Sequence, residues 1–253
     1  VDPIIIDALN LNGQYSVIIK SEERNETLLV KNVRGISARQ TDVVIHELAT
    51  ADIAAVSVGK MVLSNIIPAL AEALVHREKI TPGRALDLII AENMRDAAAF
   101  IEGQLKKIVP KNFPLSQRLG LIETSIGKMV PIMPAALQEQ DPLLVYAEPY
   151  NQLILDKDAF INPIPDVEGL EPRSPMKAWV DRKSFIHNFG HAALAYYGNL
   201  KHPECRYLYE LLAHRDTYDF TQKSMQSAAK VLLQMYPEVF SPADLENHIL
   251  DLL

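Results

Sequence analysis

Residues 52–94 read DIAAVSVGKMVLSNIIPALAEALVHREKITPGRALDLIIAENM. In this stretch residues 53–58 are a continuous apolar run with the composition of a buried strand, and residues 86–91 are a second apolar strand. Between them, residues 62–76 have the apolar spacing of an amphipathic helix, and helical patterns also occur at residues 43–49 and 94–108. This alternation of strands and helices predicts a parallel, doubly wound sheet.

The chain before this stretch predicts a helix and a hairpin. Asp2 and Pro3 are residue types favoured at the N-cap and at the first helical position, and the helix should run to about Asn10 and stop at Asn12 and Gly13. Residues 15–20 and 27–33 are short β-rich runs separated by a charged turn, so they predict a hairpin.

The chain after this stretch changes character near its prolines. Residues 121–132 and 143–150 predict extended segments, and the proline-rich residues 162–172 predict a linker. Beyond Ser174 and Pro175 the periodicity is helical, over residues 176–198, 203–214, 219–236 and 242–252. We therefore expect an α/β domain at residues 1–172 and an all-helical domain at residues 173–253.

Composition excludes several classes of protein. The chain has 253 residues, 48% of them hydrophobic, and a formal net charge of −7, which fits a soluble globular protein of one or two domains. The acidic balance argues against nucleic acid, because a phosphate backbone requires a basic surface. Cys205 is the only cysteine, which excludes an intramolecular disulfide and favours a reducing cytoplasm. No apolar run approaches the length of a membrane span, so we expect no membrane partner.

The segment KSFIHNFGH at residues 183–191 combines an amine, an amide and an imidazole. At about 100° per residue, Asn188 lies roughly 140° and His191 roughly 80° around an α-helix from Lys183, so the three can face one pocket. The flanking residues are mostly apolar, which predicts substantial burial. A desolvated amine has a lowered pKa and suits a general base in alcohol–carbonyl interconversion.

Each candidate residue also has an ordinary structural interpretation. Lys183 is compatible with a lysine that extends to solvent, and His191 with a core histidine bonded to a backbone carbonyl. Asn93 fits an N-cap and Gly59 a helix-entry turn. His187 and His191 have the i, i+4 spacing of a zinc site, but the glutamate of H-E-x-x-H and a third ligand are missing, so we expect no metal.

Several blocks in a fixed order resemble the polyol-specific long-chain dehydrogenases. The spacing Lys183-x4-Asn188-x2-His191 resembles the helix signature of that family. The other blocks are residues 2–10, which resemble the helix after the second Rossmann strand, VRGISA at 33–38 (V-x-G-V-x-A), residues 52–59 (D-L-V-x-x-A-V-G) and IIAENM at 89–94 (I-A-C-E-N-M). The segment at residues 125–131, SIGKMVP, departs from the family pattern x-V-D-R-I-V-P, since Gly127 replaces an acidic residue and Lys128 an arginine. This departure leaves the identity of the sugar substrate undetermined.

The resemblance implies an α/β fold with an incomplete Rossmann-like doubly wound sheet, followed by an all-helical substrate domain. The dinucleotide-binding glycine loop would precede Val1 and the helical domain would continue past Leu253, so the piece alone is expected to be inactive. NAD is the implied cofactor, with contacts from Val58, Gly59 and Asn93. The oligomeric state is left open.

The implied reaction is the oxidation of a sugar alcohol, with mannitol 1-phosphate and its ketose, fructose 6-phosphate, as the favoured pair. Lys183 would remove the alcohol proton, Asn188 and Asn93 would donate amide hydrogens to the oxygen, and His191 would orient a substrate hydroxyl. Hexuronate reductases and dehydrogenases of unphosphorylated polyols are alternatives within the family. A non-catalytic scaffold is the alternative from another class.

Overall fold

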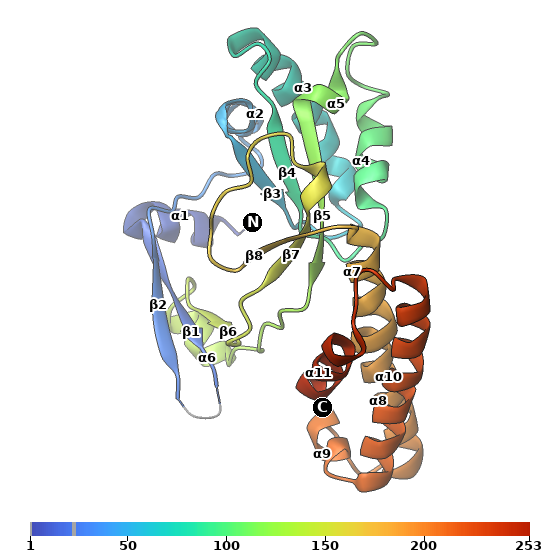
Figure 1. Ribbon diagram of the computed structural model, residues 1–253. Helices are drawn as coiled ribbons and strands as arrows, with labels where there is room; N and C mark the ends of the chain where they lie inside the picture. The colour runs from blue at the N-terminus through green and yellow to red at the C-terminus, as the bar shows by residue number, and fades with distance from the viewer. Residues whose placement is uncertain (1, 22–23) are drawn as a thin grey trace. The chain divides into compact units, whose positions relative to one another are not determined.

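The computed structural model describes residues 2–21 and 24–253, and the chain divides into two compact units (Figure 1). The first unit comprises Val1–Leu155 and Ala159–Glu171, and the second comprises Asp156–Asp158 and Pro172–Leu253. The elements that precede the helical region are, in chain order, α1 (Pro3–Asn12), β1 (Gln14–Ile19), β2 (Glu26–Lys31), α2 (Thr41–Thr50), β3 (Ile53–Val56), α3 (Leu63–Ile80), β4 (Leu86–Ile90), α4 (Ala97–Leu105), α5 (Leu115–Arg118), β5 (Leu119–Ile126), α6 (Ala135–Gln140), β6 (Val145–Ala147), β7 (Leu153–Asp156), η1 (Lys157–Ala159) and β8 (Leu170–Arg173).

The amino-terminal helix and hairpin confirm the sequence predictions. Asp2 Oδ1 accepts a hydrogen bond from the backbone N–H of Ile4 at 2.9 Å, and Gly13 ends α1 in the left-handed conformation, with φ 62°. β1 and β2 pair antiparallel, while Glu22 and Glu23 of the predicted turn lie outside the described residues. β1 also pairs in parallel with β6, which gives a three-stranded sheet that the sequence did not predict.

A five-stranded sheet has the order β3-β4-β5-β7-β8. β3, β4 and β5 are parallel, as predicted, and β7 runs antiparallel to β5. The predicted linker at residues 162–172 is wrong at its carboxyl end, because those residues enter β8 at the edge of the sheet. Pro172 lies in this strand. Proline has no backbone N–H to donate, and a strand at the edge of a sheet tolerates that absence.

The core of the first unit forms on both faces of β4. Leu86, Leu88 and Ile90 belong to the cluster that contains the buried side chains of α3 and α4. Ile89 belongs to a second cluster, with Ile122 of β5. All five residues of β4 are buried, which explains why apolar residues lie on both of its faces, with Asp87 as the one charged residue.

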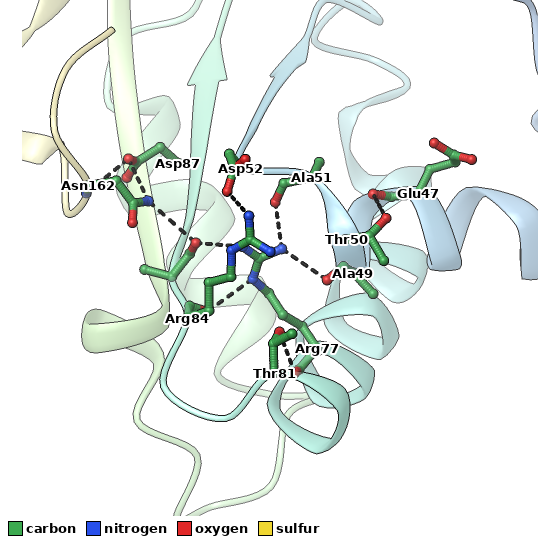
Figure 2. Close-up of polar contacts among 11 residues, drawn as sticks. Glu47, Ala49, Thr50, Ala51, Asp52, Arg77, Thr81, Arg84, Asp87 and Asn162 are labelled. Carbon is green, nitrogen blue, oxygen red and sulfur yellow. Dashed lines mark hydrogen bonds and ion pairs between the residues drawn. The ribbon is translucent and has the colours of Figure 1, made fainter.

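A buried arginine joins the elements around the amino ends of β3 and β4 (Figure 2). Arg77 of α3 is 1% exposed, and burial is the main cause that lowers the pKa of its guanidinium. The guanidinium donates to four backbone carbonyls, those of Ala49 (2.9 Å), Ala51 (2.5 Å), Arg84 (2.9 Å) and Ala85 (2.7 Å). These bonds use four of its five N–H donors and engage all three nitrogens, as a buried guanidinium requires.

Asp87 fixes the segment that was predicted as a linker. Its carboxylate is 2% exposed and accepts hydrogen bonds from the backbone N–H groups of Ile161 at 3.0 Å and Asn162 at 3.1 Å. The side chain of Asn162 donates to the same carboxylate at 2.9 Å (Figure 2). The segment after η1 is therefore held against β4 at its start.

From Met176 onward, the elements of the described chain are helical, which confirms the prediction for this region. They are α7 (Met176–Arg182), the π-helix η2 (Lys183–Asn188), α8 (Phe189–Lys201), α9 (Leu208–Leu212), α10 (Arg215–Met235) and α11 (Pro242–Leu252). In Figure 1, α8 and α10 run side by side. Residues 2–21 and 24–253 contain no helix that is long and apolar enough to cross a membrane.

Candidate active site

The candidate site residues fall into two groups, one in each unit. Val58, Gly59 and Asn93 lie in the first unit. Lys183, Asn188 and His191 lie in the second. Each group is built by its own local geometry.

The loop after β3 is held by a glutamate that the sequence analysis missed. Glu92 Oε1 accepts hydrogen bonds from the backbone N–H groups of Val58 at 2.7 Å and Gly59 at 2.9 Å. Glu92 is 8% exposed, whereas Val58 and Gly59 are exposed, so both bonds are partly buried. The sequence signal that could have identified Glu92 is its position directly before Asn93, in the block that resembles the family motif.

This loop presents an open, partly apolar surface at the carboxyl end of β3. Gly59 has φ 86°, and nothing lies within 4 Å of the place where a Cβ would project. Val58, Met61 and Val62 are exposed apolar side chains beside it. The carboxyl ends of parallel strands are where α/β sheets bind ligands. Since the N–H groups of Val58 and Gly59 are bound to Glu92, a ligand at this loop has the carbonyls, Cα atoms and apolar side chains to contact.

Asn93 follows β4 at the same edge of the sheet and is exposed. The interpretation of Asn93 as the N-cap of the next helix is wrong, because α4 begins at Ala97 and its N-cap residue is Asp96. Asn93 is therefore a polar side chain at the carboxyl edge of the sheet whose position helix capping does not explain.

Lys183 and Asn188 are the first and last residues of η2, so the α-helical geometry assumed for them is wrong. In an α-helix the two would be roughly 140° apart around the axis. A π-helix closes its turns between residues i and i+5, which brings this pair towards one side of the axis. Single π turns within α-helices are frequent at functional sites.

Burial lowers the pKa of the half-buried Lys183 amine. Removing an ammonium from water disfavours its charged form, so a larger fraction is neutral at a given pH than for a solvated lysine. The predicted burial of the whole segment is wrong for Asn188, which is exposed.

Residues before, within and after the π turn hold η2 against α10. Ile186 is fully buried in the helical core. Just before η2, Asp181 is 1% exposed and accepts a hydrogen bond from the Tyr236 hydroxyl at 2.5 Å. Just after it, Gly190 lies so close to α10 that a Cβ would be 2.7 Å from Met225 Sδ.

A cavity of about 870 Å³ opens between η2 and α10. It is lined by Ser184, Phe185, Asn188, Phe189, Ser224, Ser227, Ala228, Val231 and Met235. Among the described residues, the lining includes Asn188 but neither Lys183 nor His191. The hydroxyl of Ser184 is a further polar group at this cavity that the sequence analysis did not identify.

His191 lies within a group of histidines. Its ring packs edge-to-face on that of His187, with centroids 4.7 Å apart, and the His187 ring lies 6.5 Å from that of His248. Burial, followed by the charges of Arg182 and His187, lowers the pKa of His248 to about 4. His248 is therefore neutral at physiological pH.

Lys128, at the position where the segment departs from the family pattern, has a structural role. Its Nζ donates to the backbone carbonyls of Glu148, at 3.0 Å, and Tyr150. Gly127 lies against the Tyr150 ring. The amine thus joins the segment after β5 to the segment after β6.

The fold and the site residues define an α/β protein of Rossmann type that is followed by a helical region. A family model described as the mannitol dehydrogenase Rossmann domain matches residues 1–169, and the chain belongs to this family. A similar solved structure is the Pseudomonas fluorescens mannitol 2-dehydrogenase ternary complex with NAD and D-mannitol. The match has a TM-score of 0.71 and 16% sequence identity, and it covers 98% of this chain and 58% of that enzyme. The chain thus spans less than two thirds of that enzyme's length.

Proposed function

We propose that the protein is an NAD-dependent dehydrogenase that interconverts a sugar alcohol and its ketose, with mannitol 1-phosphate and fructose 6-phosphate as the pair. The observation that carries this proposal is membership of the mannitol dehydrogenase family together with a lysine of lowered pKa at the start of the π turn. Residues 1–172 would bind the cofactor, and residues 173–253 would contribute to the substrate site.

The loop after β3 fits a dinucleotide in chemical character. Gly59 leaves open space for a close approach, and Val58 offers an apolar surface. In the proposal these two residues and Asn93 contact NAD, and Glu92 acts as a positioning residue because it fixes the loop. NAD⁺, when bound, supplies the hydride acceptor.

The side chains of this chain manage the proton and the charge on oxygen. Lys183 Nζ accepts the hydroxyl proton of the alcohol, and burial favours the neutral amine that this step needs. The amide of Asn188 donates to this oxygen as its negative charge develops. His191 orients a neighbouring hydroxyl of the substrate.

A dehydrogenase of an unphosphorylated polyol is the second candidate, and two observations favour it. The similar solved enzyme is described with D-mannitol, which has no phosphate. Lys128, a cation near the carboxyl end of β5, is already bound to two backbone carbonyls. Initial rates of the full-length protein with mannitol, mannitol 1-phosphate and a hexuronate would distinguish these substrates.

Replacement of Lys183 tests the proposal. In the full-length protein, Lys183→Ala should lower kcat by about 10²–10⁴-fold, the usual contribution of general acid–base catalysis, while NADH affinity by calorimetry stays unchanged. Lys201→Ala is the matched control, because Lys201 is an exposed lysine at the end of α8, and its kcat should stay within about twofold. A loss below about fivefold for Lys183→Ala would exclude this residue as the base.

The scaffold alternative makes the opposite prediction for the full-length protein. It requires that none of the three substrates is turned over and that NADH titration shows no saturable binding. Turnover of any of them rejects the scaffold.

A further inference from the structure

A second group of polar side chains lies in the helical unit, where α8 ends and α10 begins. His202 and Glu204 follow α8, and His214 is the N-cap residue of α10. One ligand atom from each of these three residues lies within 4.8 Å of the other two. The thiol of Cys205, the only cysteine of the chain, is 3.6 Å from His214 Nε2.

Two distances within this group are close to those between ligands of one tetrahedral zinc ion. With bonds of about 2.0 Å to nitrogen and oxygen and 2.3 Å to sulfur, tetrahedral angles separate N from O by about 3.3 Å and N from S by about 3.6 Å. His202 Nδ1 lies 3.5 Å from Glu204 Oε1. Cys205 Sγ lies 3.6 Å from His214 Nε2.

Asp216 supplies the outer contact that metal-binding histidines usually have. Its Oδ1 lies 3.0 Å from His202 Nε2. When Nε2–H donates to this carboxylate, the lone pair of His202 is on Nδ1, the nitrogen that faces Glu204. The pairing therefore selects the tautomer that a metal ion at this place needs.

We propose that His202, Glu204, Cys205 and His214 bind one Zn²⁺ ion in a structural site. Imidazole and thiolate donors favour zinc over calcium or magnesium, and four protein ligands leave no open position for catalysis. The ion joins the end of α8 to the start of α10 across the segment that contains α9. The site is separate from the pair His187 and His191, for which the sequence lacks further ligands.

Binding of the Zn²⁺ ion requires a change in the stacking of the two histidine rings. The rings of His202 and His214 are stacked, with centroids 3.8 Å apart and 17° between their planes. Two nearly parallel rings cannot both direct a lone pair at one ion, so the His214 ring turns out of the stack when the ion binds, and its 3.6 Å contact to Cys205 Sγ is re-formed about the ion.

The test uses the purified 253-residue chain after chelator treatment. Competition between the protein and a chromophoric chelator should show one equivalent of Zn²⁺ bound. His214→Ala should weaken the affinity by at least about 100-fold, since it removes a direct ligand. Asp216→Asn should weaken it by about 10–100-fold, as for other residues that orient metal ligands. His46→Gln, which replaces an exposed histidine of α2 in the other unit, should bind within about twofold of the unchanged chain.

Cobalt gives a second readout that does not depend on the fold of the His214 variant. Co²⁺ bound by a thiolate has a near-ultraviolet charge-transfer band, which the unchanged chain should show and Cys205→Ser should lose. Circular dichroism checks that Cys205→Ser stays helical. The proposal is overturned if no stoichiometric Zn²⁺ binding occurs, if His46→Gln weakens binding as much as His214→Ala, or if the cobalt band persists in Cys205→Ser. The first of these outcomes would identify the cluster as a stacked histidine pair with an ion pair to Asp216.

Discussion

Glu92→Ala should destabilise the first unit and loosen the loop after β3. The substitution removes the acceptor of two hydrogen bonds, from the N–H groups of Val58 at 2.7 Å and Gly59 at 2.9 Å. Bonds to a charged group contribute about 1.5–3 kcal/mol each. Val58 is 40% exposed, so water reaches the freed N–H groups and the lower value applies. The expected loss for the pair is about 3 kcal/mol.

Urea unfolding followed by circular dichroism measures this loss. Trp179, the only tryptophan, lies in the second unit, so its fluorescence reports mainly on that unit. Glu92→Gln keeps a carbonyl oxygen for both N–H groups and should lose only about 1 kcal/mol. Glu139→Ala, at an exposed site on α6, should change stability by less than about 0.5 kcal/mol. If Glu92→Ala is no more destabilising than Glu139→Ala, the account of this loop is refuted.

Two further predictions concern the oxygen site and pH. In the full-length protein, Asn188→Ala should lower kcat/KM by an amount equivalent to about 3 kcal/mol, because its amide donates to the oxygen that becomes negative; an unchanged kcat/KM in steady-state kinetics would contradict this role. Burial, Arg182 and His187 lower the pKa of His248 from 6.5 to about 4, so between these pH values the unfolded chain binds a proton that the folded chain does not. The free energy of unfolding should therefore fall by about 3 kcal/mol on acidification across this window. Urea unfolding at both ends of this pH window should show a smaller fall in the free energy of unfolding for His248→Gln than for the unchanged chain. An equal fall would contradict the assignment of this pH dependence to His248.

The local patterns of the sequence were sufficient to predict most elements. The largely apolar run of β4 indicated a strand buried on both faces, and Asp2 with Gly13 marked the two ends of α1. These signals act within a few residues, so the amino-acid types alone carry them. The same holds for the lysine, the asparagine and the histidine at residues 183–191, which the sequence grouped correctly within one helical stretch.

The elements that the sequence analysis missed depend on partners far away along the chain. Residues 143–150 were predicted as extended, but the pairing of β6 with β1 was not, and β8 becomes a strand by joining the edge of the five-stranded sheet. Short strands with few apolar residues have little propensity of their own, and the hydrogen bonds of the sheet stabilise them. The role of Glu92 also depends on distant residues. Its carboxylate accepts from the N–H groups of Val58 and Gly59, which lie 34 and 33 residues earlier in the chain.

The sequence by itself therefore determined the fold class, the family resemblance and the residue types available for chemistry. Only the tertiary structure decided how those residues are presented. The π turn of η2 is the clearest case, since it lies among tertiary contacts: the buried Ile186, the Asp181 contact to Tyr236 and the close approach of Gly190 to Met225. An α-helix is the preferred local state of such a segment, and packing against α10 determines the wider turn that brings Lys183 and Asn188 towards one side.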